Sequence, residues 1–126
     1  MLKVAPTLIV EKIEPTMSFL VKRLGFTKAV DVPAEDGSLA FAMMVNGNVE
    51  IHLQSRASVA KDTPYLAGCQ MPPSSFLYID VEDVASLYEE LKNADVILPL
   101  QKTFYGAQHF FIREPGGHVL GFSKNG

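Results

Sequence analysis

The order of predicted strands and helices occurs twice along the chain, and this repeat restricts the possible folds more than any other feature of the sequence. Apolar patterns predict a strand, a helix and three strands over residues 5–10, 15–24, 27–32, 38–45 and 48–54. The same order returns over residues 75–81, 84–91, 96–100, 108–113 and 118–123. A unit that recurs after roughly 70 residues indicates an internal duplication.

The ends of several elements carry local signals. The first predicted helix ends at Gly25, and its apolar face consists of Met17, Leu20, Val21 and Leu24. Asn46-Gly47 predicts a hairpin turn, and Asp83 is a suitable N-cap for the second helix. Residues 55–73 lack periodicity and contain several Pro and Gly residues, which favours a connecting segment. We therefore predict one domain over residues 1–126, with modules at about 1–55 and 74–126 and a linker at about 56–73.

A tight turn near the C-terminus joins the last two predicted strands. Pro115 presets a turn, and Gly116 and Gly117 can both take the positive φ angles that a hairpin needs. In the strand that follows, one face carries large apolar residues and the other carries the small residues Gly121 and Ser123. A cavity over this small face is therefore expected.

Alternating side chains predict which sheet faces are free for a ligand. In residues 48–54 the apolar residues should pack on the helix, while Glu50, His52 and Gln54 point the other way. We predict an α+β fold in which two βαβββ modules form a curled mixed sheet cup, with the uncovered faces lining the cup. By the strand period of two, the pocket candidates are Ala5, Thr7, Glu50, His52, Gln54, Phe76, Tyr78, Gly121 and Ser123. Three further candidates, which depend on strand bulges, are Phe41, Met43 and Phe111.

Composition excludes several kinds of partner. The hydrophobic fraction of 48% is sufficient for a buried core, and a net charge of -3 without a basic cluster argues against nucleic acid. The apolar runs are too short to cross a membrane and the N-terminus lacks a secretory pattern, so we expect a soluble, cytoplasmic protein. Cys69 is the only cysteine, so an internal disulfide or a thiolate metal cluster is not expected.

Two segments of the chain carry a recognisable pattern. They read Ser-Phe-Leu-Val-Lys-Arg-Leu-Gly-Phe at 18–26 and Tyr-Gly-Ala-Gln-His-Phe-Phe-Ile-Arg-Glu-Pro-Gly-Gly-His-Val-Leu-Gly-Phe at 105–122. Together with the repeat, they resemble the glyoxalase, bleomycin-resistance protein and extradiol-dioxygenase group, also called the vicinal oxygen chelate superfamily. The resemblance implies paired βαβββ modules, often a homodimer, and a cup that holds a divalent metal or a drug-like molecule. It does not fix the reaction, because this scaffold serves several chemistries.

The resemblance also implies where a metal would bind. Its ligands, typically His and Glu, would occupy the positions of Ala5, His52, Phe76 and Gly121. Only His52 has a donor side chain, whereas even catalytic zinc normally needs three protein ligands. We therefore predict no metal. The alternative is a divalent metal held by Glu50, His52 and further ligands in a shifted register.

His52 is the candidate catalytic residue, because a histidine in a cavity can act as a general base near neutral pH. The alternative is a structural histidine, bonded to Glu50, to Gln54 or to a dimer partner. We expect Glu50 to be a weak partner, since residues two apart on one strand face lie about 6.5 to 7 Å apart.

Aromatic side chains give the other ligand-binding candidates. Phe41, Met43, Phe76, Tyr78 and Phe111 can stack on an apolar ligand, or they can be ordinary core or interface residues. The resemblance implies a loop over the cup at Phe104, Tyr105 and His109, and Tyr65 is a possible lid.

We therefore predict a homodimer that binds a small, partly apolar organic molecule without metal, with sequestration or resistance as its function. One alternative is a metal-dependent lyase, isomerase or dioxygenase of the same superfamily. Another is a metal-free enzyme that uses His52 as its base.

Overall fold

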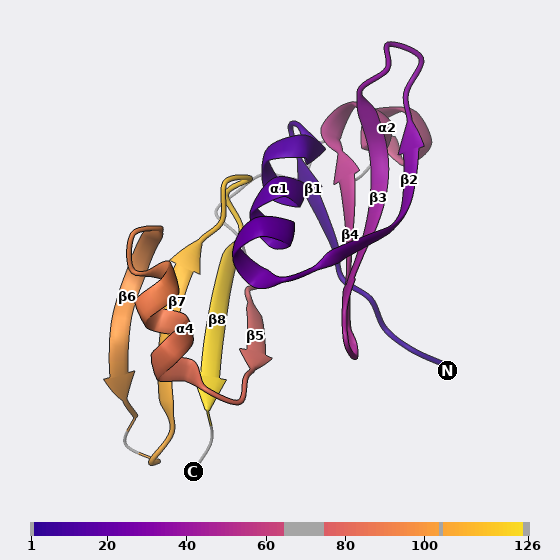
Figure 1. The fold of residues 1–126 in the computed structure, drawn as a ribbon. Helices are drawn as coiled ribbons and strands as arrows, with labels where there is room; N and C mark the ends of the chain where they lie inside the picture. Colours follow the sequence, from indigo (N-terminus) through magenta and orange to yellow (C-terminus); the bar gives the residue numbers. More distant parts are fainter. Residues whose placement is uncertain (1, 65–74, 104, 125–126) are drawn as a thin grey trace. The chain divides into compact units, whose positions relative to one another are not determined.

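The computed structural model describes residues 2–64, 75–103 and 105–124. The chain divides into two compact units, Met1–Gln70 and Met71–Gly126, whose helices and strands Figure 1 shows in sequence colours. Each unit contains the predicted strand, helix and three strands, which confirms the α+β class and the two βαβββ modules. No helix among the described residues is long and apolar enough to span a membrane.

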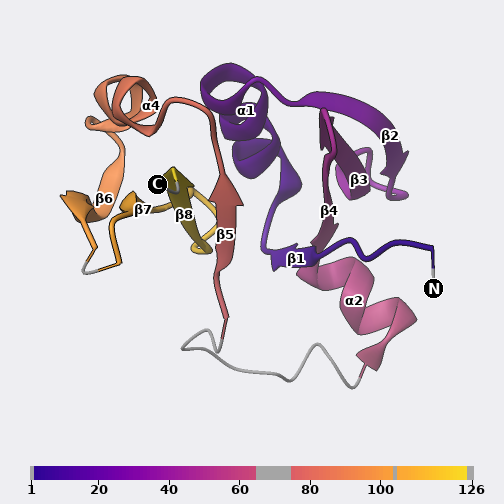
Figure 2. The same cartoon turned by 90° about the horizontal axis from the view of Figure 1, so that it is seen from below.

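The first unit consists of a four-stranded sheet with a helix on each face. In chain order its elements are β1 (Thr7–Val10), α1 (Ile13–Leu24), β2 (Thr27–Pro33), β3 (Leu39–Asn46), β4 (Val49–Ser55) and α2 (Arg56–Asp62). The strand order is β1-β4-β3-β2, with β1 parallel to β4 and the other pairs antiparallel. Helices α1 and α2 lie on opposite sides of β1 (Figure 2). Helix α2 therefore covers part of the face that α1 leaves open.

Helix α1 begins earlier and is rotated relative to the prediction. Its buried residues are Ile13, Thr16 and Leu20, whereas Val21 is 42% exposed. The predicted apolar face was therefore wrong at Val21, because Ile13 extends the helix and moves the buried stripe around its axis. Gly25 ends the helix with φ 72°, as predicted.

Helix α2 is a correction to the sequence analysis, which predicted irregular chain at this point. The Ser55 side chain caps it by accepting a hydrogen bond from the backbone N–H of Ser58 at 3.1 Å, and Val59 is buried beneath it. Seven residues are too few to show a helical period in the sequence, so packing of Val59 on the sheet decides the conformation.

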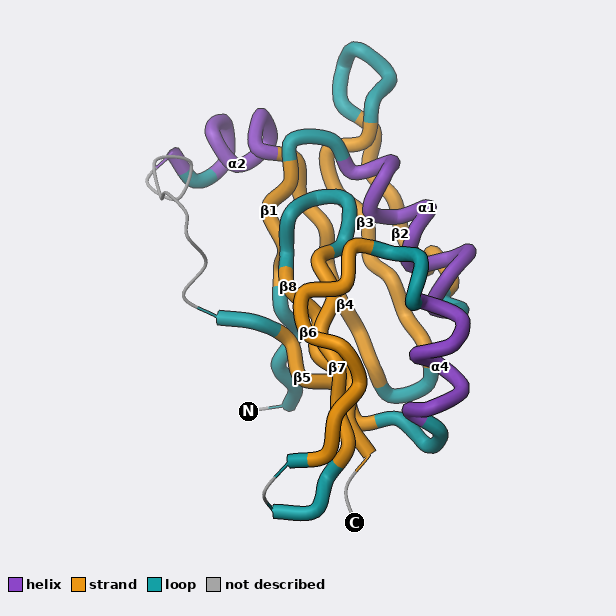
Figure 3. Tube along the Cα trace, turned by 90° about the vertical axis from the view of Figure 1, so that its left-hand side faces the viewer, coloured by secondary structure: helices purple, strands orange, loops and turns teal. Residues whose placement is uncertain are grey.

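The second unit has the same arrangement with one described helix. Its elements are β5 (Leu77–Asp80), α4 (Val84–Leu91), β6 (Asp95–Lys102), β7 (Gln108–Arg113) and β8 (Val119–Lys124). The strand order is β5-β8-β7-β6, and α4 runs along one face of the sheet (Figure 3). Asp83 caps α4 as predicted, accepting a hydrogen bond from the Ser86 N–H at 3.0 Å. The core beneath α4 includes Phe110 and Phe122, which are 0% and 2% exposed.

The turn between β7 and β8 begins with a buried acidic residue. Glu114 is 1% exposed, and its carboxylate accepts hydrogen bonds from the N–H groups of Gly116 at 2.8 Å and His118 at 3.1 Å. Of the two turn glycines that can take positive φ, Gly117 does so, at 99°, and Gly116 does not. The carboxylate satisfies two donors of the turn, and one left-handed residue is sufficient to close it.

The space over Gly121 is filled, contrary to the expected cavity over this small face. A Cβ atom on Gly121 would lie 2.6 Å from Cε2 of Phe111, its cross-strand neighbour on β7. The Phe111 ring therefore occupies the room that the missing side chain leaves.

Candidate functional site

In the first unit the strand alternation places the polar residues of β4 as predicted. Ile51 and Leu53 are buried at 1% and 0% exposure, while Glu50, His52 and Gln54 are partly exposed on the face opposite α1. Across the sheet, His52 pairs with Thr7 of β1 and Met43 of β3, and Phe41 pairs with Gln54. Thr7, Met43 and Phe41 therefore lie on the same face as His52.

A chain of charged and polar groups fixes His52 on this face. The Nε2 atom of His52 lies 2.6 Å from Oε2 of Glu50, and Nζ of Lys3 lies 2.8 Å from Oε1 of the same carboxylate. The expectation that Glu50 is a weak partner was wrong, because the side chains bend toward each other across the backbone spacing. The hydrogen bond from Lys3, followed by that from His52, holds the pKa of Glu50 below its ordinary value.

This hydrogen bond determines the chemistry that His52 can perform. A carboxylate only accepts hydrogen bonds, so Nε2 of His52 carries the proton and Nδ1 is the acceptor of the neutral ring. The Phe41 ring stands edge-to-face on His52 at a centroid distance of 5.3 Å. At the α2 end of the face, the Gln54 amide donates to the Ser58 hydroxyl at 3.1 Å.

In the second unit, four rings form a contiguous group on the sheet face opposite α4, here called the aromatic cluster. Its members are Phe76, Tyr78, His109 and Phe111. Phe76 and Phe111 lie 5.1 Å apart between centroids, and His109 and Phe111 lie 5.2 Å apart. Phe76 and Tyr78 remain 53% and 46% exposed. Phe76, Tyr78 and Phe111 were predicted as ligand-binding candidates. His109 was expected in a loop over the cup, but it lies on β7, two residues before Phe111 and therefore on the same face of the sheet.

Polar contacts connect the aromatic cluster to the loop before β7. The Tyr78 hydroxyl lies 2.9 Å from Nδ1 of His109. A hydrogen bond with Tyr78 is the main cause that raises the pKa of Tyr105, which is 59% exposed. The other predicted loop and lid residues, Phe104 and Tyr65, lie outside the described residues.

Within each unit, the side chains that the structure describes do not form a site for a divalent metal. Ala5, Phe76 and Gly121 offer no donor side chain, and the Phe111 ring fills the space at Gly121. His52 has only Glu50 as a nearby acidic partner, and the described residues contain no group of three or more His, Cys, Asp and Glu side chains arranged to bind an ion. Metal-free binding stays a prediction.

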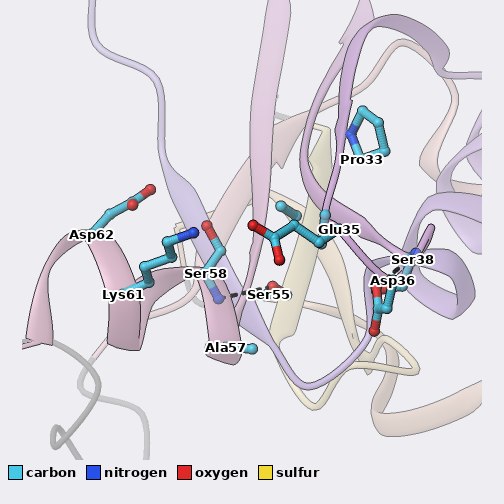
Figure 4. Close-up of a pocket in the computed structure, with 11 residues that line it drawn as sticks. Pro33, Glu35, Asp36, Ser38, Ser55, Ala57, Ser58, Lys61 and Asp62 are labelled. Atoms are coloured by element: carbon cyan, nitrogen blue, oxygen red, sulfur yellow. Dashed lines mark hydrogen bonds between the residues drawn. The ribbon is translucent and has the colours of Figure 1, made fainter.

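The first unit also has a surface cavity of about 460 Å³ between α2 and the β2–β3 connection. Figure 4 shows Glu35, Ser58 and Lys61 turned toward this space, with Ser55 at its floor. The sequence did not indicate this cavity, because α2 forms one of its walls and the pattern of these residues predicts an irregular connecting segment.

Comparison with known proteins places the chain in a family. The model of the Glyoxalase/Bleomycin resistance protein/Dioxygenase superfamily matches residues 4–122. The chain belongs to this superfamily. The resemblance seen in the sequence is therefore confirmed, and the reaction and ligand are left open because the superfamily includes several activities.

Solved structures similar to this superfamily member agree in fold. TioX from Micromonospora sp. ML1 is 21% identical, with 97% of each chain covered and a TM-score of 0.76. A glyoxalase/bleomycin resistance protein/dioxygenase family enzyme from Burkholderia phytofirmans PsJN is 16% identical, with 95% of each chain covered and a TM-score of 0.77. Lactoylglutathione lyase from Agrobacterium tumefaciens is 12% identical, with 98% and 94% covered and a TM-score of 0.76. Comparison with curated proteins found no match.

Proposed function

We propose that this superfamily member binds a small, partly apolar organic molecule without a metal, and that holding the molecule is its function. The aromatic cluster is the observation that carries the proposal. It has an exposed ring at Phe76 and the Phe111 ring over Gly121, which are two of the positions where metal-binding relatives are expected to carry ligands. Aromatic walls with a few polar groups are typical of small-molecule sites.

The test measures binding of aromatic antibiotics and naphthalene derivatives by thermal melting and by calorimetry. We expect Phe76→Ala to weaken binding of any compound found by about tenfold, since an aromatic pair contributes about 0.5–1.5 kcal/mol beyond the buried area. Val21→Ala is the matched control, because Val21 is 42% exposed on α1 of the first unit and takes no part in the ring contacts of the aromatic cluster among the described residues. Binding that is unchanged in both Phe76→Ala and Tyr78→Ala would refute a site at the aromatic cluster.

The hydrogen bond between His52 and Glu50 favours a second candidate function, a metal-free enzyme with His52 as its base. With Nε2 bonded to the carboxylate, Nδ1 can take a proton from a bound carbon or oxygen acid, and Glu50 stabilises the imidazolium that forms. The experiment follows exchange of carbon-bound hydrogen for deuterium in bound compounds. The base assignment requires His52→Gln to abolish exchange and Glu50→Gln to slow it at least about tenfold without changing binding. Exchange that persists in His52→Gln would exclude it.

A further inference from the structure

We propose that the aromatic cluster selects planar aromatic molecules that carry an oxygen hydrogen-bond acceptor, and that the side chain of His109 donates the N–H that recognises this oxygen. The inference rests on the proposed function and names the class of ligand for the same site.

The geometry of the rings leaves room for a flat ligand. Phe76 meets Phe111 at an interplanar angle of 77° and Tyr78 at 75°, so neither ring stacks parallel on it. Phe76 and Tyr78 are also about half exposed, at 53% and 46%. An aromatic ligand can therefore stack on the exposed part of Phe76, on which no ring of the aromatic cluster stacks in parallel.

A hydrogen-bond relay sets the direction in which His109 donates. Tyr78 has one hydroxyl proton to share between its two partners, Tyr105 and His109. A phenol O–H is a more acidic donor than the N–H of a neutral imidazole, whereas an unprotonated ring nitrogen is a good acceptor, so the 2.9 Å contact favours donation from the Tyr78 hydroxyl to His109 over the reverse. Tyr78 then donates to Nδ1 of His109, and the proton of the neutral imidazole lies on Nε2.

The resulting Nε2–H group has no acceptor among residues 2–64, 75–103 and 105–124. Among the described residues, the interactions of His109 are the Tyr78 hydrogen bond and its ring contacts, so none engages Nε2. Tyr78 at 89° and Phe111 at 76° contact the imidazole edge-to-face and limit its rotation. A donor held beside a stacking surface favours an oxygen acceptor on the ligand.

The polar part of this face has a second group without a partner. Ser123, the cross-strand neighbour of His109, is 1% exposed, and its hydroxyl makes no hydrogen bond within the described part of the chain. A buried hydroxyl without a partner is unfavourable, but the Ser123 oxygen is closed off from solvent, so His109 is the donor that an incoming oxygen would meet.

The experiment compares two ligands with the same ring and opposite hydrogen-bonding character. The probes are 2-naphthoate, which accepts, and 2-naphthylmethylammonium, which only donates, and calorimetry measures the affinity of each. In His109→Phe the aromatic ring stays and the donor is lost. We expect 2-naphthoate to bind about tenfold or more weakly to this variant, while 2-naphthylmethylammonium binds equally to both proteins. The ratio between variant and wild type cancels the general repulsion of an anion by a chain of net charge -3.

Control variants separate the inference from the proposed function. Phe76→Ala should weaken both probes equally, and Val21→Ala neither. If wild type binds both probes and His109→Phe changes neither affinity, the inference is wrong and the proposed binding function stands. If wild type binds neither probe, both are refuted for this site.

A second measurement needs no ligand, and its main result comes from the wild-type protein. Nitrogen-15 NMR of the free protein reports which ring nitrogen of His109 carries the proton. In the neutral imidazole we expect a protonated Nε2 and an unprotonated Nδ1, and an altered tautomer balance in Tyr78→Phe. Protonation at Nδ1 in the wild type would overturn the relay and the inference with it.

Discussion

At the scale of single residues, the contact between Gly121 and Phe111 gives a direct prediction. Gly121→Ala places a methyl group 2.6 Å from the Phe111 ring, so the ring or the strand must move. We expect the free energy of unfolding to fall by about 1–3 kcal/mol, the usual cost of overpacking. Urea unfolding monitored by circular dichroism measures the change.

The matching control removes the ring. In a Phe111→Ala background, Gly121→Ala should cost much less, because the atoms that it would meet are absent. If Gly121→Ala lowers the free energy of unfolding equally with and without the Phe111 ring, Phe111 does not fill the space over Gly121.

Glu50 gives a pH dependence at the same scale. Its folded pKa is lowered by Lys3 and His52, so its contribution to stability is present above the ordinary value of 4.5 and is lost as the pH falls through the folded pKa. We expect wild type to melt above Glu50→Gln at pH 5 and the difference to shrink toward about pH 3. Thermal melting across this range measures it.

Glu35→Gln is the control for this pH series, because Glu35 is exposed and no interaction of Glu35 with another described residue is present. The difference in melting temperature between wild type and Glu35→Gln should not change over the same pH range. A difference between wild type and Glu50→Gln that grows as the pH falls would contradict the assigned hydrogen bonds.

At the scale of elements, the β7–β8 turn depends on the Glu114 carboxylate. Glu114→Gln replaces an oxygen that accepts from Gly116 or His118 with an amide donor, which leaves a backbone N–H facing another donor. We expect a loss of about 1–3 kcal/mol in the free energy of unfolding, the usual cost of an unsatisfied buried group. Urea unfolding is the measurement, with the exposed Glu82→Gln as control. Equal stability of the two variants would mean that the turn does not need the carboxylate.

At the scale of the whole molecule, the metal content of the purified protein distinguishes metal-free binding from a metal-dependent enzyme activity. We expect protein purified without a metal-affinity tag to contain less than one equivalent of metal. Its melting temperature should not change with EDTA, zinc, nickel, manganese or iron(II), because the described donors do not form a three-ligand site. Stoichiometric metal that is lost in His52→Ala would establish the metal-dependent alternative. The homodimer stays a prediction.

Much of the secondary structure was predictable from local patterns. Helix Val84–Leu91 and strand Gln108–Arg113 have the predicted bounds, since a capping Asp and a turn with Pro and Gly are visible in the sequence. Helix α2 was not predictable, because its stability comes from burying Val59 rather than from a repeated pattern.

The sequence by itself determined the duplicated strand order, the superfamily resemblance and the sheet face on which each β4 side chain lies, because these depend on periods of 2 and 3.6 residues. Only the tertiary structure decided which side chains touch. In the folded chain Glu50 forms a hydrogen bond with His52, the Phe111 ring lies over Gly121, and the Tyr78 hydroxyl forms a hydrogen bond with His109. The reason is physical: a period fixes the direction of a side chain, whereas rotamers and neighbouring strands fix its contacts.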